Sequence, residues 1–243
     1  TAASNNITSS DIYNLFLHSG TSNSFFRHNT LSTAKEGISI RSSSHSNYFF
    51  NNTITGNSEY GVQSIDSYYN NFVNNTFINN SKTGTYQIYL SNSDYNNFTN
   101  NNLTQSTTGM FVVNSEYLEM FDNNINASDS PSLAINSSSN LEIINNTVWN
   151  NVEIHDAPNS NISRNLIIQN LSIFNSDTLV MISNNITNFL IVDGSENLNI
   201  SKNYLIDNNI THTKYSTIDN NQLNKLNLAN FSFGTISNTD VDV

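Results

Sequence analysis

Short apolar stretches recur along the chain at nearly constant intervals, and most of them contain two adjacent asparagines. The repeat is clearest at 49–54, 72–77 and 98–103, where the order is Phe, any residue, Asn, Asn, any residue, apolar. Aligned on the last apolar residue, the copies number twelve: Ile7, Leu31, Ile54, Phe77, Leu103, Ile125, Val148, Ile167, Ile186, Leu205, Leu223 and Val241. The copies follow one another at 22–26 residues up to Val148 and at 18 or 19 residues from there on.

A second column of this alignment is free of polar residues. Five residues before the aligned position stand Ala2, Phe26, Phe49, Phe72, Phe98, Met120, Ile143, Ile162, Met181, Ile200, Ile218 and Ile236. Most copies also open with an apolar pair two residues apart, such as Ile88 and Leu90. Because side chains alternate between the faces of a β-strand, this spacing predicts two or three very short strands per copy, joined by polar corners.

One such copy is too small to bury its own apolar side, so the copies must stack. Parallel strands stack at about 4.8 Å, which predicts a rod of roughly 55–60 Å for twelve copies. We therefore expect an all-β chain that forms a right-handed parallel β-helix of about twelve coils, as one domain over residues 1–243. The longer coils should give the N-terminal half a ridge of loops along one edge.

The asparagine two residues before the aligned position is expected to be structural. Asparagine tolerates the left-handed backbone conformation of tight corners, and stacked amides can hydrogen-bond from coil to coil. The pattern therefore predicts a corner ladder of Asn29, Asn52, Asn75, Asn101, Asn123, Asn146, Asn165, Asn184, Asn203 and Asn221.

Composition agrees with this fold and narrows the function. The chain has 50 Asn, 36 Ser and 22 Thr, which weaken helices, while 36% apolar residues are too many for a disordered chain. A net charge of −11 opposes binding to nucleic acid. No cysteine and no apolar run of membrane-spanning length occur in the sequence.

The segment Tyr86–Phe98 reads Tyr-Gln-Ile-Tyr-Leu-Ser-Asn-Ser-Asp-Tyr-Asn-Asn-Phe. It resembles the parallel β-helix repeat of pectin-active enzymes, of periplasmic proteins of the nitrous-oxide-reductase maturation type, and of Asn/Thr-rich surface proteins and adhesins, many of them archaeal. The resemblance covers essentially the whole chain. It implies the fold and leaves the function open, because this scaffold serves hydrolases, lyases, binding proteins and passive spacers.

Catalytic residues do not emerge from the sequence, and we assign no cofactor and no metal. Of the motifs of pectin hydrolases only Asn238-Thr239-Asp240 occurs, and the five histidines do not share a column of the alignment. One acidic column does bring Asp94 and Glu116 onto neighbouring coils, beside a column of Tyr69, Tyr95 and Tyr117. This flank could bind a glycan, with sugar rings on the aromatic faces, or Ca²⁺; alternatively its residues are simply exposed corner residues.

Fifteen Asn-x-Ser/Thr sequons are present, only slightly more than composition alone would produce. The candidates for N-glycosylation are Asn51, Asn74, Asn79, Asn97, Asn102, Asn145, Asn170 and Asn209. Of these, Asn51, Asn74 and Asn145 flank the corner asparagine and should point outward.

The repeat runs in register to both ends, where Ala2 and Ile7 open the two apolar columns and Ile236 and Val241 close them. Uncovered solenoid ends require a partner, which would be a head-to-tail copy of the chain or neighbouring coils of a longer solenoid. We therefore expect an extracellular structural protein, a cell-surface, filament, sheath or adhesin-like subunit. The alternative is a β-helix that binds or cleaves polysaccharide along the Asp94 and Glu116 flank.

Overall fold

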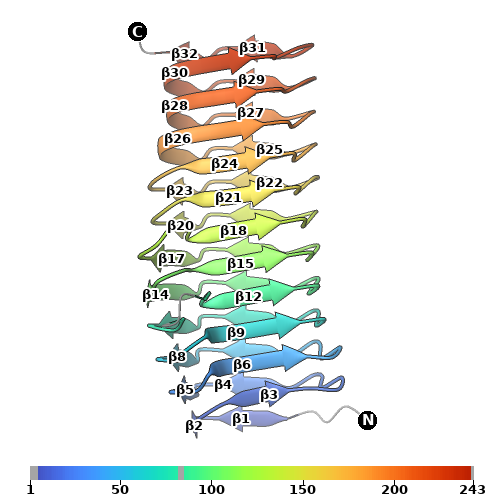
Figure 1. Cartoon of the computed structure of the whole chain (residues 1–243), viewed down its shortest axis with the longest axis vertical. Helices are drawn as coiled ribbons and strands as arrows, with labels where there is room; N and C mark the ends of the chain where they lie inside the picture. Colours follow the sequence, from blue (N-terminus) through green and yellow to red (C-terminus); the bar gives the residue numbers. More distant parts are fainter. Residues whose placement is uncertain (1–4, 82–84, 242–243) are drawn as a thin grey trace.

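The computed structural model describes residues 5–81 and 85–241. All regular secondary structure in these residues is β, and the coils stack one above another along the long axis of the molecule (Figure 1). Strands pair in parallel in two sheets, one of 12 strands and one of 20. The predicted all-β parallel β-helix of about twelve coils is therefore confirmed. The described residues contain no helix, and so none that is long and apolar enough to cross a membrane.

The 12-stranded sheet, called sheet A here, takes one short strand from each coil. Its strands, in spatial order, are β1 (Asn6–Thr8), β4 (Phe25–Arg27), β7 (Tyr48–Phe50), β10 (Asn71–Val73), β13 (Asn97–Thr99), β16 (Glu119–Phe121), β19 (Glu142–Ile144), β22 (Asn161–Ser163), β25 (Val180–Ile182), β27 (Asn199–Ser201), β29 (Thr217–Asp219) and β31 (Thr235–Ser237).

The 20-stranded sheet, sheet B, forms two further faces of the solenoid. One face contains β2 (Asp11–Ile12), β5 (Thr30–Ser32), β8 (Thr53–Thr55), β11 (Thr76–Ile78), β14 (Asn102–Ser106), β17 (Asn124–Ala127), β20 (Thr147–Val148), β23 (Leu166–Ile167) and β32 (Asp240–Val241). The other contains β3 (Leu15–Leu17), β6 (Glu36–Arg41), β9 (Tyr60–Ile65), β12 (Ile88–Ser91), β15 (Met110–Val113), β18 (Leu133–Asn136), β21 (Val152–His155) and β24 (Leu171–Phe174). Three longer strands run through both faces: β26 (Asn185–Asp193), β28 (Tyr204–Thr211) and β30 (Gln222–Ala229).

The longer coils of the N-terminal half are a feature of one corner. Ladder partners lie 22–26 residues apart between Asn29 and Asn146, and 18 or 19 residues apart from Asn146 to Asn221. The extra residues separate the two faces of sheet B. In the C-terminal coils this corner is so short that one strand continues through it, as in β26.

The core is built from columns that repeat in register from coil to coil. In sheet A, Phe49, Phe72 and Phe98 pair as direct neighbours and are at most 1% exposed. Their rings stack with centroids 4.6 Å apart and planes within 6°. Burial alternates along each three-residue strand, so the residues on either side of the core phenylalanine face outward.

The corner asparagines form a buried hydrogen-bonded ladder. Asn75 Nδ2 and the Asn75 backbone N–H both donate to Asn101 Oδ1, at 3.1 and 2.9 Å, and the same pair of bonds recurs from coil to coil. Each amide also donates to a strand carbonyl, as Asn101 does to Phe72 O at 2.8 Å. Two shorter ladders, which the repeat alignment does not single out, include Asn47, Asn70 and Asn96, and Asn57 with Asn80.

The register expected for the first coil is wrong. Ile7 pairs with Phe26 in sheet A, and Ile12 is the residue that pairs with Leu31. The reason is that the Ser10 backbone N–H donates to Asn29 Oδ1 at 3.1 Å, so Ser10 takes the position that the alignment gave to Asn5. Ile7 therefore shares its column with Ile236, and Ala2 lies outside the described residues.

Candidate functional site

Three tyrosines form a stack on the corner that leads into sheet A. Successive coils hold this corner by backbone bonds, such as Tyr95 N–H to Glu116 O at 2.9 Å. The Tyr69 and Tyr95 rings lie 4.6 Å apart at 17°, and the Tyr95 and Tyr117 rings lie 4.6 Å apart at 3°. All three side chains are exposed, between 42 and 48%.

The backbone at this corner does not favour aromatic residues. The φ angles of Tyr69, Tyr95 and Tyr117 are +57°, +56° and +54°, a region that a bulky side chain rarely adopts. Further along the same column, Asn140 and Asn159 have the same φ of +56°. Ring stacking contributes about 0.5–1.5 kcal/mol per pair and can offset such strain, which typically costs about 1–3 kcal/mol per residue.

The stack changes the expected chemistry of the tyrosine column. Because the rings cover one another face to face, a sugar cannot lie on the inner aromatic faces, contrary to the mode of binding expected from sequence. The ring edges and the phenol hydroxyls remain exposed, one set per coil. Burial raises the pKa of Tyr95, and the neighbouring Tyr117 and Tyr69 and the carboxylates of Asp94 and Glu116 add to this. At neutral pH the Tyr95 hydroxyl is therefore a neutral donor.

A groove runs beside the tyrosine stack. It has a volume of about 430 Å³ and is lined by Tyr69, Asn71, Tyr95, Asn97, Tyr117 and Glu119. The three non-aromatic residues are outward-facing first residues of β10, β13 and β16, and they are direct neighbours in register. Asn97 Nδ2 donates to Glu119 Oε2 at 2.7 Å.

The groove therefore presents two parallel rows of polar groups, one pair per coil. One row consists of phenols, and the other consists of two amides and a carboxylate. The second row was missed from sequence, because its column also contains Phe25, Tyr48 and Val180 and shows no uniform residue type. Sequence position could have identified the row, because Asn71, Asn97 and Glu119 each immediately precede a core phenylalanine or methionine.

Asp94 and Glu116 occupy neighbouring coils, but neither lines the groove. Asp94 Oδ1 accepts the Glu116 backbone N–H at 2.8 Å, and Asp177 accepts that of Glu196 in the same way at 2.7 Å. The two aspartates of this acidic column thus accept hydrogen bonds that connect neighbouring coils. A different carboxylate pair, Glu119 and Glu142, lies side by side in register on sheet A.

The candidate sequons occupy two kinds of position. Exposed corner positions are held by Asn51, Asn79 and Asn145, with φ between +52° and +59°. Half-buried positions are held by Asn74, Asn97, Asn102, Asn170 and Asn209. A sugar on Asn97 would fill the groove, so that site is in competition with binding there.

The end columns can be compared at two residues. Ile7 is half-buried, while Ile236 on β31 is 46% exposed, although its neighbour in the same column, Ile218, is 1% exposed. Val241 continues the other column by pairing with Leu223.

Comparison with known proteins agrees on the fold. A family model described as periplasmic copper-binding protein (NosD) matches residues 1–87. No curated protein sequence matches the chain. Within the described residues no three His, Cys, Asp or Glu side chains converge on one point, so the residues present do not form a copper site of that composition.

Three solved structures share the architecture. They are DFA-IIIase from Arthrobacter chlorophenolicus A6 in complex with GF2 (10% identity, 78% of this chain and 61% of that chain, TM-score 0.63), the mannuronan C-5 epimerase AlgE6 A-module of Azotobacter vinelandii (12%, 95% and 79%, 0.62), and the Streptococcus pneumoniae surface protein and adhesin PfbA (12%, 90% and 77%, 0.57). The chain thus spans less than two thirds of DFA-IIIase. At these identities the likeness concerns the fold alone, and together with the family model it supports the right-handed parallel β-helix repeat expected from sequence.

Proposed function

We propose that this chain is a surface or envelope β-helix that binds an extended glycan along sheet A without cleaving it. The observation that carries the proposal is the groove with one phenol and one amide or carboxylate per coil. Coils repeat at about 4.8 Å, close to the rise of one sugar residue in an extended chain. A glycan lying along the axis would therefore meet the same pair of hydrogen-bonding groups at successive residues.

The tyrosines at this strained corner support the same assignment. Asparagine fits this corner in neighbouring coils, so the aromatic residues are not required by the fold. Positive φ recurs at corners along the whole solenoid, so these three positions are distinguished by their bulky aromatic side chains and not by the backbone angle itself. The adhesin and the mannuronan epimerase named above indicate that related scaffolds serve at surfaces and on polysaccharides.

A binding role fits the groove better than a cleaving role. Glycosidases use two carboxyl groups that flank the scissile bond. Among the residues that the structure describes, Glu119 is the only carboxylate that lines this groove, and it accepts a hydrogen bond from Asn97.

The test compares two sets of tyrosine substitutions in a binding assay on immobilised neutral and acidic polysaccharides. The test variant is Tyr69→Asn, Tyr95→Asn and Tyr117→Asn together, which places in the column a residue that it already holds elsewhere. The control is Tyr215→Asn, at the same kind of corner (φ +52°) but stacked on Phe233, away from the groove. We expect the triple variant to lose affinity at least about tenfold, the scale of two or three hydrogen bonds, and the control to bind normally.

Equal binding by the triple variant and the wild type would overturn the proposal. Release of reducing ends from any of the polysaccharides, abolished by Asp94→Ala, would instead favour a cleaving enzyme on the flank of Asp94 and Glu116. Melting temperatures of all variants show whether the fold is retained.

End-to-end assembly is a second proposed role, favoured by the exposed Ile236 in a column whose members from Phe26 to Ile218 are buried. It does not compete with glycan binding, because the groove lies on the flank of the rod.

A further inference from the structure

A second hollow on sheet A adjoins the groove on the side of the N-terminal coils. It has a volume of about 270 Å³ and is lined by Phe25, Phe26, Arg27, Tyr48 and Phe50. Tyr48 pairs in register with Asn71, which lines the groove. The two hollows therefore lie on successive coils along one outward column of sheet A, the groove on its tyrosine side and this hollow on its Arg27 and Phe50 side, and together they define a surface path.

The path follows a single outward column of sheet A. Phe25, Tyr48, Asn71, Asn97 and Glu119 are successive members of this column, and each pairs with the next. Four coil steps separate the first from the last, which is roughly 19 Å at the spacing of parallel strands. A short oligosaccharide can span this length.

The aromatic rings of the second hollow are spaced more widely than those of the tyrosine stack: the Tyr48 and Phe50 rings are nearly parallel (14°), but their centroids lie 6.2 Å apart. The Phe25 and Tyr48 rings are tilted by 52° with centroids 5.9 Å apart, and His28 meets Phe50 edge-on at 85°. Phe25 is 51% exposed. The Phe25 ring therefore offers apolar surface here to the apolar face of a sugar.

Arg27 adds an uncompensated positive charge to this hollow. It is exposed, and within residues 5–81 and 85–241 it makes no side-chain hydrogen bond or ion pair. Its register neighbours in the column are Thr8 and Phe50, neither of which is acidic. A guanidinium in this setting is suited to a carboxylate, which it can hold with two parallel hydrogen bonds.

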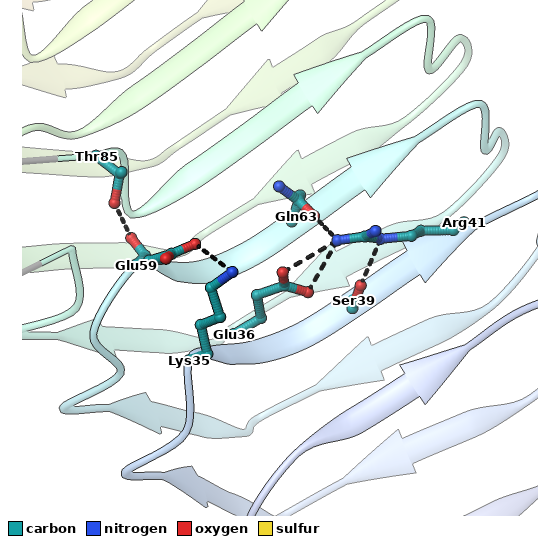
Figure 2. Close-up of polar contacts among 7 residues, drawn as sticks. All are labelled: Lys35, Glu36, Ser39, Arg41, Glu59, Gln63 and Thr85. Carbon is teal, nitrogen blue, oxygen red and sulfur yellow. Dashed lines mark hydrogen bonds and ion pairs between the residues drawn. The ribbon is translucent and has the colours of Figure 1, made fainter. Parts of the chain in front are cut away.

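Arg41 shows what an engaged arginine looks like in the same chain (Figure 2). Its Nη2 donates to both oxygens of Glu36 at 3.0 and 3.2 Å and also to Gln63, while its Nε donates to Ser39 at 3.0 Å. Glu36 is 9% exposed and lies on the same strand as Arg41, so the ion pair is internal to one coil, while the bond to Gln63 reaches the neighbouring coil. Arg27 has no such partner.

We propose that the hollow at Arg27 binds a sugar residue that carries a carboxylate, at one end of the glycan held in the groove. The ring lies against Phe25 and Tyr48, and the carboxylate pairs with Arg27. This inference rests on the proposed function, because the remainder of the glycan occupies the groove beside the tyrosines.

The charge at the other end of the path restricts the ligand further. Glu119 and Glu142 are exposed neighbours in one ladder, and the chain carries a net charge of −11. A glycan with a carboxylate on every residue would place negative charges beside these glutamates. The site therefore selects a glycan that is acidic at one residue and neutral over the rest.

The test uses three tetrasaccharide probes in isothermal titration calorimetry. The first is neutral except for one terminal glucuronic acid, the second is its carboxyl-reduced form, and the third has a carboxylate on every residue. We expect the first to bind about tenfold or more tightly than either of the others, the scale of a charge-assisted hydrogen bond. The preference should shrink as salt is raised, because the site is exposed.

Two arginine variants isolate the role of Arg27. Arg27→Gln should abolish the preference for the acidic probe, so that the acidic and reduced probes bind this variant with equal affinity. Arg164→Gln makes the same change in net charge at another exposed arginine, on the corner between β22 and β23, and should keep the preference.

The outcomes separate this inference from the proposed function. A preference that survives Arg27→Gln, or equal binding of the first two probes together with sensitivity to the triple tyrosine variant, overturns the inference and leaves glycan binding intact. Tightest binding of the fully carboxylated probe also overturns it. Binding of none of the probes or polysaccharides overturns both.

Discussion

In several coils two adjacent asparagines have different roles, which depend on the groups that each amide contacts. Asn101 is buried, and its amide satisfies a backbone carbonyl of one coil and the ladder of the next. Its neighbour Asn100 is exposed at a left-handed corner, φ +55°, where asparagine is tolerated better than most residues. Adjacent asparagines in the repeat are thus not interchangeable.

We predict that Asn101→Ala destabilises the protein by about 3 kcal/mol, because it leaves the Asn75 backbone N–H and amide without their acceptor in a buried site. Thermal unfolding followed by circular dichroism checks this. The matched control is Asn126→Ala, an exposed asparagine on β17 outside the ladder. A melting temperature for Asn101→Ala equal to that of the control would contradict a structural role for the ladder.

The asparagine ladder could be predicted from the sequence and the groove could not, for one physical reason. The ladder is buried and each member bonds to the next, so its residue type repeats and an alignment finds it. The row of Asn71, Asn97 and Glu119 faces solvent, where nothing forces repetition. The shorter ladder of Asn47, Asn70 and Asn96 is a case between these two. It is buried, but the next position of its column holds Leu118, so the asparagine pattern ends partway along the chain.

At the scale of the strand, a three-residue element is stable only as part of a column. Each strand of sheet A contributes a single inward side chain, and the packing partners of that side chain lie in the coils above and below. The contacts that stabilise each strand are therefore made mainly between coils, along the column of inward residues, and not within the strand itself.

We predict that Phe98→Ala lowers stability by about 3–5 kcal/mol, the usual cost of emptying a phenylalanine site in a core. Phe98 is 1% exposed and its ring lies 4.6 Å from that of Phe72, so the cavity opens inside the stack. The midpoint of denaturant unfolding measures the effect. Phe25→Ala, at an exposed position of the same sheet, should change the midpoint much less, and equal shifts would show that the register is wrong.

The stability of the C-terminal coils should depend on pH through the carboxylates of Asp193 and Asp219. Hydrogen bonds lower the pKa of Asp219 below 3.8, first from Ser237 and then from Asn238 and Asn220, and the pKa of Asp193 is lowered by bonds from Thr211 and His212. A lowered pKa in the folded state means that the stabilisation is fully present above the unfolded value. It is lost as the pH falls below about 3.8 and through the folded value.

We therefore expect protection from hydrogen exchange in β28 and β30 to fall as the pH is lowered below about 3.8 in the wild type. In Asp193→Asn with Asp219→Asn this fall should be smaller, because the linked groups no longer titrate. Asp129→Asn, on a corner between β17 and β18, is the control and should behave as the wild type does. An unchanged pH profile in the double variant would contradict the assignment.

The first coil shows the limit of pattern reading at this scale. Its sequence Asn5-Asn6-Ile7 imitates the repeat, yet Ile7 belongs to the column of Phe26 and Ile12 to that of Leu31. Both columns accept Ile, so residue type alone cannot distinguish a coil of 24 residues from one of 19. The hydrogen bond from Ser10 to Asn29 decides it.

For the whole molecule, the parallel stack makes the two ends complementary in principle. The core column of sheet A begins among the described residues at Ile7 and reaches Ile236, and every intervening member is buried. A further coil, from the same polypeptide or from a second copy, would continue this column. The corrected register means that a second copy would set Ile7 against Ile236, not against Val241.

We predict that the chain associates head to tail as its concentration rises, and that Ile236→Lys prevents this. The joint would pair the backbone edge of β31 with that of β1 and would bury Ile236, which is 46% exposed. A lysine there would have to lose its hydration within an apolar column, which is costly. Light scattering coupled to size-exclusion chromatography, with electron microscopy of the largest species, gives the mass and shape.

Phe233→Lys adds the same charge to the same coil at a corner residue that is 79% exposed, and should leave association intact. A wild-type chain that keeps its monomer mass at every concentration would remove head-to-tail assembly and leave glycan binding as the remaining proposed role.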